Sequence, residues 1–163
     1  MRKHLLKLAY LLLALLLVSA ALAQSLKLSG PFSRSAITAL HAINATGWAL
    51  PASVHELEAR QADAQSRMED AKDAAQSQDD ADAFIYLQRY QLRHSQNFAD
   101  NSNAVTKAAA TMKGKDALQR AAEAVAKEPR MMARKKKENA CAAALEKALQ
   151  SRVFSPPSAC EVY

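Results

Sequence analysis

Glycine and proline are scarce in this chain, and their near absence from its long middle part excludes most turn-rich folds. Only three glycines occur in 163 residues, and no proline lies between Ala52 and Glu128. Aromatic residues make up 6% of the chain, and β-branched residues are also few. Strands and the tight turns between them depend on these residue types. The sequence therefore argues against a β-rich fold.

The short motifs that carry most catalytic chemistry are also missing. There is no Gly-x-Ser-x-Gly, no glycine-rich phosphate loop, no His-Glu-x-x-His and no Cys-x-x-Cys. Three histidines, His41, His55 and His94, fall in separate helical segments and at no metal-ligand spacing. We therefore expect a protein that is not an enzyme and that needs no cofactor or metal. A metal-binding or hydrolytic protein that uses these histidines is the alternative.

Alanine, by contrast, is abundant, with 36 residues in the chain. Alanine has the highest intrinsic helix propensity, whereas glycine and proline have the lowest. The composition therefore predicts an all-α fold, a small antiparallel helical bundle or hairpin that follows a cleaved signal peptide.

Residues 1–23 have the three parts of a secretory signal peptide: a basic start, a leucine-rich apolar run and a small-residue end with Ala21 and Ala23. We expect cleavage after Ala23 and an exported protein, either periplasmic or secreted. The uncharged stretch 8–26 is almost long enough to span a bilayer. An uncleaved membrane anchor that keeps the same helical domain on the membrane is therefore the alternative.

The positive charge of the chain is partly a property of this leading segment. The formal net charge is +6, and three of the basic residues lie within residues 1–23, so +3 remains after cleavage. A basic patch that binds nucleic acid through its bases also carries aromatic side chains that stack on them, and none accompany the basic residues here. The sequence therefore argues against nucleic acid as a partner.

Beyond the signal peptide, we expect a leader over residues 24–34, a helical domain over 35–151 and a tail over 152–163. A first helix is expected to begin at Ser33 or Ser35 and to end near Gly47. The centre of the domain is expected to be an antiparallel hairpin of Ser53–Gln78 and Asp80–Met112, against which the first and last helices pack. Further breaks are expected at Asp100–Asn103, at Gly114 and before Pro129.

Apolar and small residues recur at alternating three- and four-residue spacing along both arms of this hairpin, which places them on one face of each helix. Alanine dominates the first arm and makes its core contact thin. We therefore expect the bundle to need a partner, either an unknown protein or envelope component or a second copy of the chain. The two predicted seams are Val54, Leu57, Gln61, Ala64, Met68, Ala71 and Ala75, and then Phe84, Leu87, Gln91, His94, Phe98, Asn101, Val105, Ala108 and Met112.

The two cysteines, Cys141 and Cys160, are predicted to form a disulfide. Exported proteins fold in an oxidising compartment, where paired cysteines persist as bridges. Cys141 lies in the last predicted helix and Cys160 in the tail. We therefore expect the bridge to hold the tail against that helix.

Four consecutive basic residues, Arg134, Lys135, Lys136 and Lys137, form the strongest local charge in the chain. Successive helical residues point about 100° apart, so four of them cover the whole circumference of a helix. One of them would face the core of a packed helix, so we expect this segment to project past the bundle or to lie at its end. These four residues are the candidate contact for an anionic surface or an acidic partner. The sequence thus predicts an exported, non-enzymatic helical protein that binds or builds structure in the cell envelope or the extracellular space.

The signal-peptide prediction is tested by N-terminal sequencing of the exported protein. We expect the mature chain to begin at Gln24, because signal peptidase accepts small side chains such as Ala21 and Ala23 before the cut. A mature protein that still begins at Met1 would support the uncleaved anchor instead.

Overall fold

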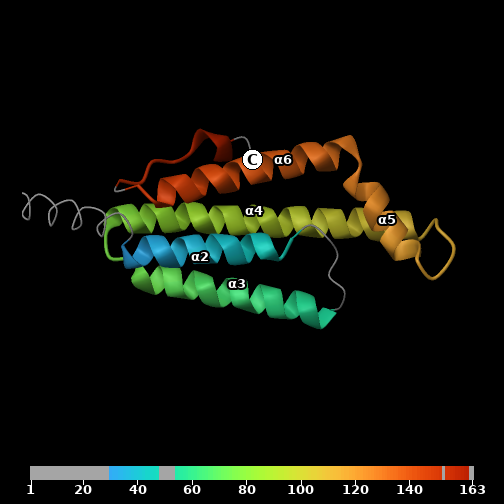
Figure 1. Cartoon of the computed structure of the whole chain (residues 1–163), viewed down its shortest axis with the longest axis horizontal. Helices are drawn as coiled ribbons and strands as arrows, with labels where there is room; N and C mark the ends of the chain where they lie inside the picture. The colour runs from blue at the N-terminus through green and yellow to red at the C-terminus, as the bar shows by residue number, and fades with distance from the viewer. Residues whose placement is uncertain (1–29, 48–53, 152, 162–163) are drawn as a thin grey trace, which may run out of the picture. The chain divides into compact units, whose positions relative to one another are not determined.

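The computed structural model describes residues 30–47, 54–151 and 153–161. The chain divides into two units, Met1–Gly30 and Pro31–Tyr163, and the fold given below is that of the second unit. Every regular element among the described residues is helical, which confirms the prediction of an all-α helical bundle (Figure 1). The elements are α2 (Pro31–Ala45), α3 (Val54–Ala74), α4 (Gln78–Ala109), α5 (Ala117–Ala126), α6 (Pro129–Leu149) and the 3-10 helix η1 (Ser158–Cys160).

The predicted signal peptide and the predicted helix cap at Ser53 both lie outside the described residues. Within the described part of the chain, no helix is long and apolar enough to cross a membrane.

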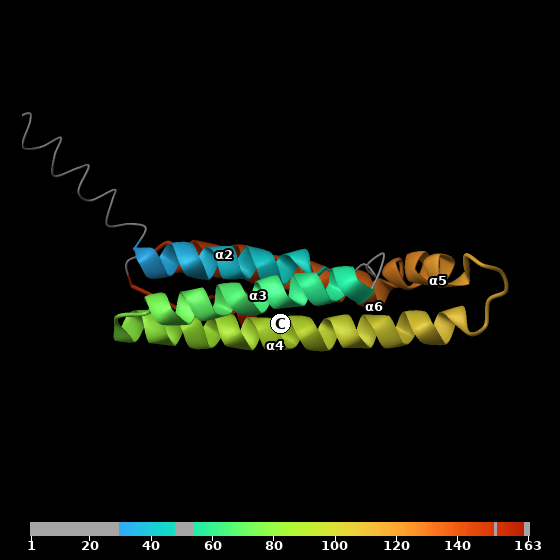
Figure 2. The same ribbon diagram turned by 90° about the horizontal axis from the view of Figure 1, so that it is seen from below.

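Helix α2 lies at the centre of the bundle, in contact with α3, α4 and α6 (Figures 1 and 2). The predicted central hairpin of α3 and α4 is therefore not the main packing unit, because α3 packs far more extensively on α2 than on α4. This choice of partner follows from the width of the apolar faces. On α3, three residues, Ala64, Met68 and Ala71, belong to the buried core, and they form a narrow stripe that packs closely on one neighbouring helix. Helix α2 buries six residues, namely Phe32, Ala36, Ala39, Leu40, Ala42 and Ile43.

Helix α2 begins earlier than the sequence predicted. The helix starts at Pro31 rather than after Ser33 or Ser35, because the fixed φ of proline suits the first turn, where its missing N–H has no partner to lose. The predicted end is confirmed: Gly47 has a φ of 68°, the left-handed conformation that glycine adopts most readily after a helix.

A reciprocal pair of hydrogen bonds begins α4. The Asp80 backbone N–H donates to Ser77 Oγ over 3.1 Å, and the Ser77 backbone N–H donates to Asp80 Oδ2 over 3.1 Å. This capping box satisfies two backbone donors that a helix start leaves unpaired. The sequence predicted the acidic start of this helix, but not Ser77 as its cap.

Helix α4 runs without interruption through Asp100–Asn103, so the predicted break there is wrong. Asn101 and Val105 lie one turn apart on its buried side, with exposed fractions of 7% and 1%. Tertiary burial of this face outweighs the poor helix propensity of four consecutive polar residues. All nine residues predicted for this seam, from Phe84 to Met112, are buried or half-buried.

The buried apolar side chains form two clusters. The larger one is built by α2, α3, the first half of α4 and the second half of α6. The smaller one joins Val105 of α4 to Ala121 and Val125 of α5 and Met131 of α6. Leu118 lies seven residues before Val125, a spacing that places both near one helix face, but Leu118 is 53% exposed. Figure 2 shows α5 beside the end of α4, where this smaller cluster lies.

The tail returns onto α6, as the sequence predicted. The sulfur atoms of Cys141 and Cys160 lie 1.94 Å apart, at disulfide-bonding distance. The Phe154 ring packs on Tyr86 of α4, with ring centroids 5.4 Å apart. The tail is therefore held both by a covalent bridge to α6 and by an aromatic contact with α4.

Two leucines on α4 provide a matched test of this core. Leu87 is fully buried in the larger cluster, whereas Leu92 is 61% exposed. We expect Leu87→Ala to lower the free energy of unfolding by about 3 kcal/mol through lost burial and the cavity left behind. Leu92→Ala should change it by less than about 0.5 kcal/mol. Urea unfolding followed by circular dichroism measures both values, and equal losses would contradict this packing.

Candidate functional site

The four basic residues singled out in the sequence do not project from the bundle. Helix α6 packs on α4 along this stretch, with Met131 and Glu138 buried at the two ends of one inward face. Arg134 falls on the same face, because it lies three and four residues from them. Its side chain is 38% exposed and donates to Asp100 of α4, with 3.0 Å between Nη1 and Oδ2. The prediction that this segment projects past the bundle is therefore wrong.

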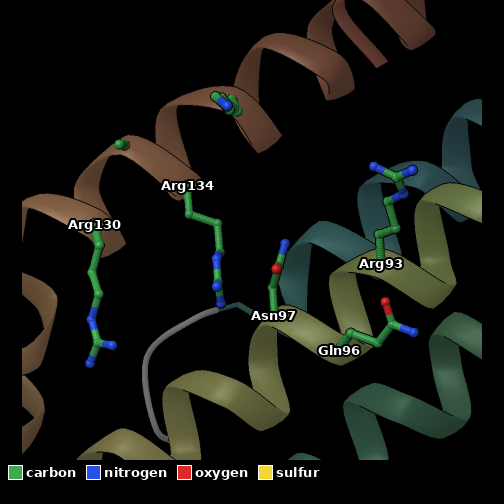
Figure 3. Close-up of a pocket in the computed structure, with 7 residues that line it drawn as sticks. Arg93, Gln96, Asn97, Arg130 and Arg134 are labelled. Carbon is green, nitrogen blue, oxygen red and sulfur yellow. The ribbon is translucent and has the colours of Figure 1, made fainter. Parts of the chain in front are cut away.

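Arg134 and Lys137 line a groove between α4 and α6 with a volume of about 540 Å³. Lys135 and Lys136 are exposed and do not line it. Figure 3 shows Arg130 and Arg134 extending from α6, with Arg93, Gln96 and Asn97 on the facing helix α4. The structure therefore divides the basic run into residues that line the groove and residues that do not. The groove is lined by Arg93, Gln96, Asn97, Arg130, Ala133, Arg134 and Lys137.

Four cationic side chains, from both α4 and α6, line this groove. Two of them, Arg130 and Arg134, form ion pairs with carboxylates. Glu128 accepts from Arg130 Nε over 2.6 Å, and Asp100 accepts from Arg134. Both ion pairs are exposed, so they orient the guanidinium groups while adding little stability. Lys137 has no ion-pair partner among the described residues.

A buried polar network lies beneath the groove. His94 of α4 is 3% exposed and lies between Thr46, at the end of α2, and Glu138 of α6. Its Nε2 atom is 2.6 Å from Thr46 Oγ1, and its Nδ1 atom forms a short contact with Glu138 Oε1. Asn97 donates from Nδ2 to the second oxygen of Glu138 over 2.9 Å. Asn97 also lines the groove and so connects the network to it.

The Thr46 hydroxyl also lies 2.8 Å from the carbonyl oxygen of Ile43, which can only accept a hydrogen bond. The hydroxyl has one proton, so when it donates to Ile43 it accepts from His94 Nε2. On its other side the imidazole shares a hydrogen bond between Nδ1 and Glu138 Oε1, so both ring nitrogens are hydrogen-bonded.

A hydroxyl, an imidazole and a carboxylate in sequence resemble a nucleophile, a base and its orienting group. In this structure the three side chains join the end of α2 to α4 and α6 through buried hydrogen bonds.

Tyr90, one turn before His94, completes the surroundings of the network. Its ring stacks near the imidazole with centroids 6.3 Å apart, and its hydroxyl donates to Asn44 Oδ1. Burial, and next the negative charge of Glu138, raise the pKa of Tyr90 well above its usual value. The phenol therefore stays neutral and serves as a hydrogen-bond donor.

The three histidines predicted as candidate ligands have separate partners. His41 lies 3.3 Å from Glu146, and His55 lies 3.5 Å from Glu58 on the surface of α3. Among the described residues, no three histidine, cysteine or acidic side chains form a group that could hold a metal ion.

Sequence reasoning did not identify Glu138, Thr46 or Arg130 as site residues. A signal for Glu138 does exist in the spacing of α6, where residues 131, 134, 138, 141, 145 and 149 follow one another at spacings of three or four. An acidic residue at a core position of such a pattern predicts a buried partner.

Two glutamates of α6 allow the buried pair to be tested against an exposed one. We expect Glu138→Gln to lower the free energy of unfolding by about 3 kcal/mol, because it breaks a buried hydrogen-bonded pair of ionisable groups. Glu146→Gln, which removes the exposed partner of His41, should change it by less than about 0.5 kcal/mol. Thermal unfolding measures both losses. A loss as small for E138Q as for E146Q would contradict the buried pair.

Comparison of the chain with protein-family models, with curated proteins and with solved structures gave no match.

Proposed function

We propose that this protein is an exported, non-enzymatic helical binding protein of the cell envelope or the extracellular space. In this proposal, it holds an anionic partner in the groove between α4 and α6. The observation that carries the proposal is the gathering of four cationic side chains from two helices around one groove, with two amide side chains among them.

Arrangement within the groove favours binding over simple solvation of charge. Basic residues that only keep a protein soluble spread over its exposed faces, as Lys135 and Lys136 do. Arg130, Arg134 and Lys137 instead follow one another along the side of α6 that faces α4. Arg93 adds a fourth cation from α4. Cations that line one concave surface raise the local potential together and attract an anion more strongly than scattered charges do.

A binding role also agrees with the chemistry of the network below the groove. Thr46 and His94 are almost fully buried, and both ring nitrogens of His94 are hydrogen-bonded. The anchored alternative, in which the leading segment is kept in a membrane, would leave the same groove available. N-terminal sequencing separates the two forms.

Helix α6 supplies a charge-matched pair of variants for the test. R130Q/K137Q removes two cations from the groove, and K135Q/K136Q removes two cations from outside it. We expect the groove variant to bind dextran sulfate, a polymeric anion without phosphate, about tenfold more weakly, since charge-assisted hydrogen bonds are lost. The control variant should lose less than about twofold. Fluorescence anisotropy at several salt concentrations measures both affinities.

Equal losses in the two double variants would mean that net charge, not the groove, determines anion binding, and would overturn the proposal. Circular dichroism of both variants verifies that the helices are retained. Because both changes lie on the exposed side chains of one helix, a difference between them reports on position alone.

A further inference from the structure

We propose that the groove between α4 and α6 is a binding site for a phosphate group, presented either by a free phosphate compound or by a lipid headgroup. This inference rests on the proposed function and specifies its ligand. It is drawn from the geometry of the donors on the two walls of the groove, α4 and α6.

Most donors on the α6 wall belong to guanidinium groups that form ion pairs with carboxylates. Arg130 uses Nε in its contact with Glu128, and Arg134 uses Nη1 in its contact with Asp100. A guanidinium carries five N–H donors in a fixed plane, so each acid fixes the direction of its arginine and leaves further donors. The two arginines are thus oriented in advance, which reduces the entropy lost when a ligand binds.

The opposite wall carries different donors. Helix α4 contributes the Arg93 guanidinium and the side-chain amides of Gln96 and Asn97 (Figure 3). A ligand that fills the groove therefore meets donors from two sides. A carboxylate has two oxygens in one plane, which a single guanidinium can engage side by side. A phosphate presents three strong acceptor oxygens in a tetrahedral arrangement and can accept from both walls together.

The buried carboxylate of Glu138 does not line the groove, and it meets the groove only through its contact with Asn97. Glu138 is 3% exposed, and its two oxygens are hydrogen-bonded with His94 and with Asn97. The contact with Glu138 holds the Asn97 side chain at the groove.

Two sources of phosphate are compatible with this chemistry, and binding experiments distinguish them. Pyrophosphate tests a free phosphate compound, with citrate as a carboxylate control of similar charge. Phosphatidylcholine vesicles that contain phosphatidic acid test a headgroup, with vesicles that contain oleate as the carboxylate control. Isothermal titration calorimetry measures the soluble ligands, and co-sedimentation measures the vesicles. Residues 24–163 are used throughout, with the disulfide intact.

The expected result is a preference for phosphate of about tenfold or more over the matching carboxylate, on at least one of the two arms. Binding of pyrophosphate alone assigns a free phosphate compound, and binding of phosphatidic acid vesicles alone assigns a headgroup. Binding that is equal for phosphate and carboxylate on both arms, or absent on both, would overturn the inference.

A charge-conserving variant tests the forked geometry itself. R130K/R134K keeps every positive charge but replaces two planar groups by point charges. We expect it to lose phosphate binding by about tenfold while its binding of dextran sulfate falls by less than about twofold. Unchanged phosphate binding would overturn the role of the arginine forks. If phosphate shows no preference while dextran sulfate still depends on R130Q/K137Q, the ligand class is wrong and the proposed function stands.

Discussion

The hydrogen bond between His94 and Glu138 is the contact on which the rest of this structure depends. It joins α4 to α6, and through Thr46 it also fixes the end of α2. Three helices therefore meet at one buried imidazole. A buried carboxylate needs a partner that satisfies its oxygens. Here that partner is His94, which lies 44 residues away in sequence.

Helix α6 brings a buried carboxylate and a set of cations together. Glu138 lies on its inward face, where both carboxylate oxygens are hydrogen-bonded. Arg134 lies on that same face, and with Arg130 and Lys137 it lines the groove, where the acids paired with the arginines are exposed. One helix face thus serves both the buried network and the groove.

Much of the fold could be predicted from the sequence, whereas the site could not. The seam of α4 was predictable because apolar residues recur at helical spacing over eight turns, and the pairing of Cys141 with Cys160 because the chain has only two cysteines. The close packing of α3 on α2 was not, since the choice of partner depends on the width of both apolar faces. Glu138 and Arg93 were not predicted as residues of this site, because a charged residue is expected on the surface. The residues that such a side chain meets on another helix cannot be read from the pattern of its own helix.

The layer of polar residues between the two apolar clusters has a consequence for cooperativity. Hydrophobic contacts join the elements on either side of it, but across the layer the helices are joined by directional bonds and by the continuous backbones of α4 and α6. The end that contains α5 is held by four buried apolar side chains and the partly buried ones around them, and the Cys141–Cys160 bridge lies with the larger cluster. The smaller apolar burial predicts that this end opens more readily than the rest of the bundle. Because Arg130 lies at the same end, local opening would take one wall of the groove with it.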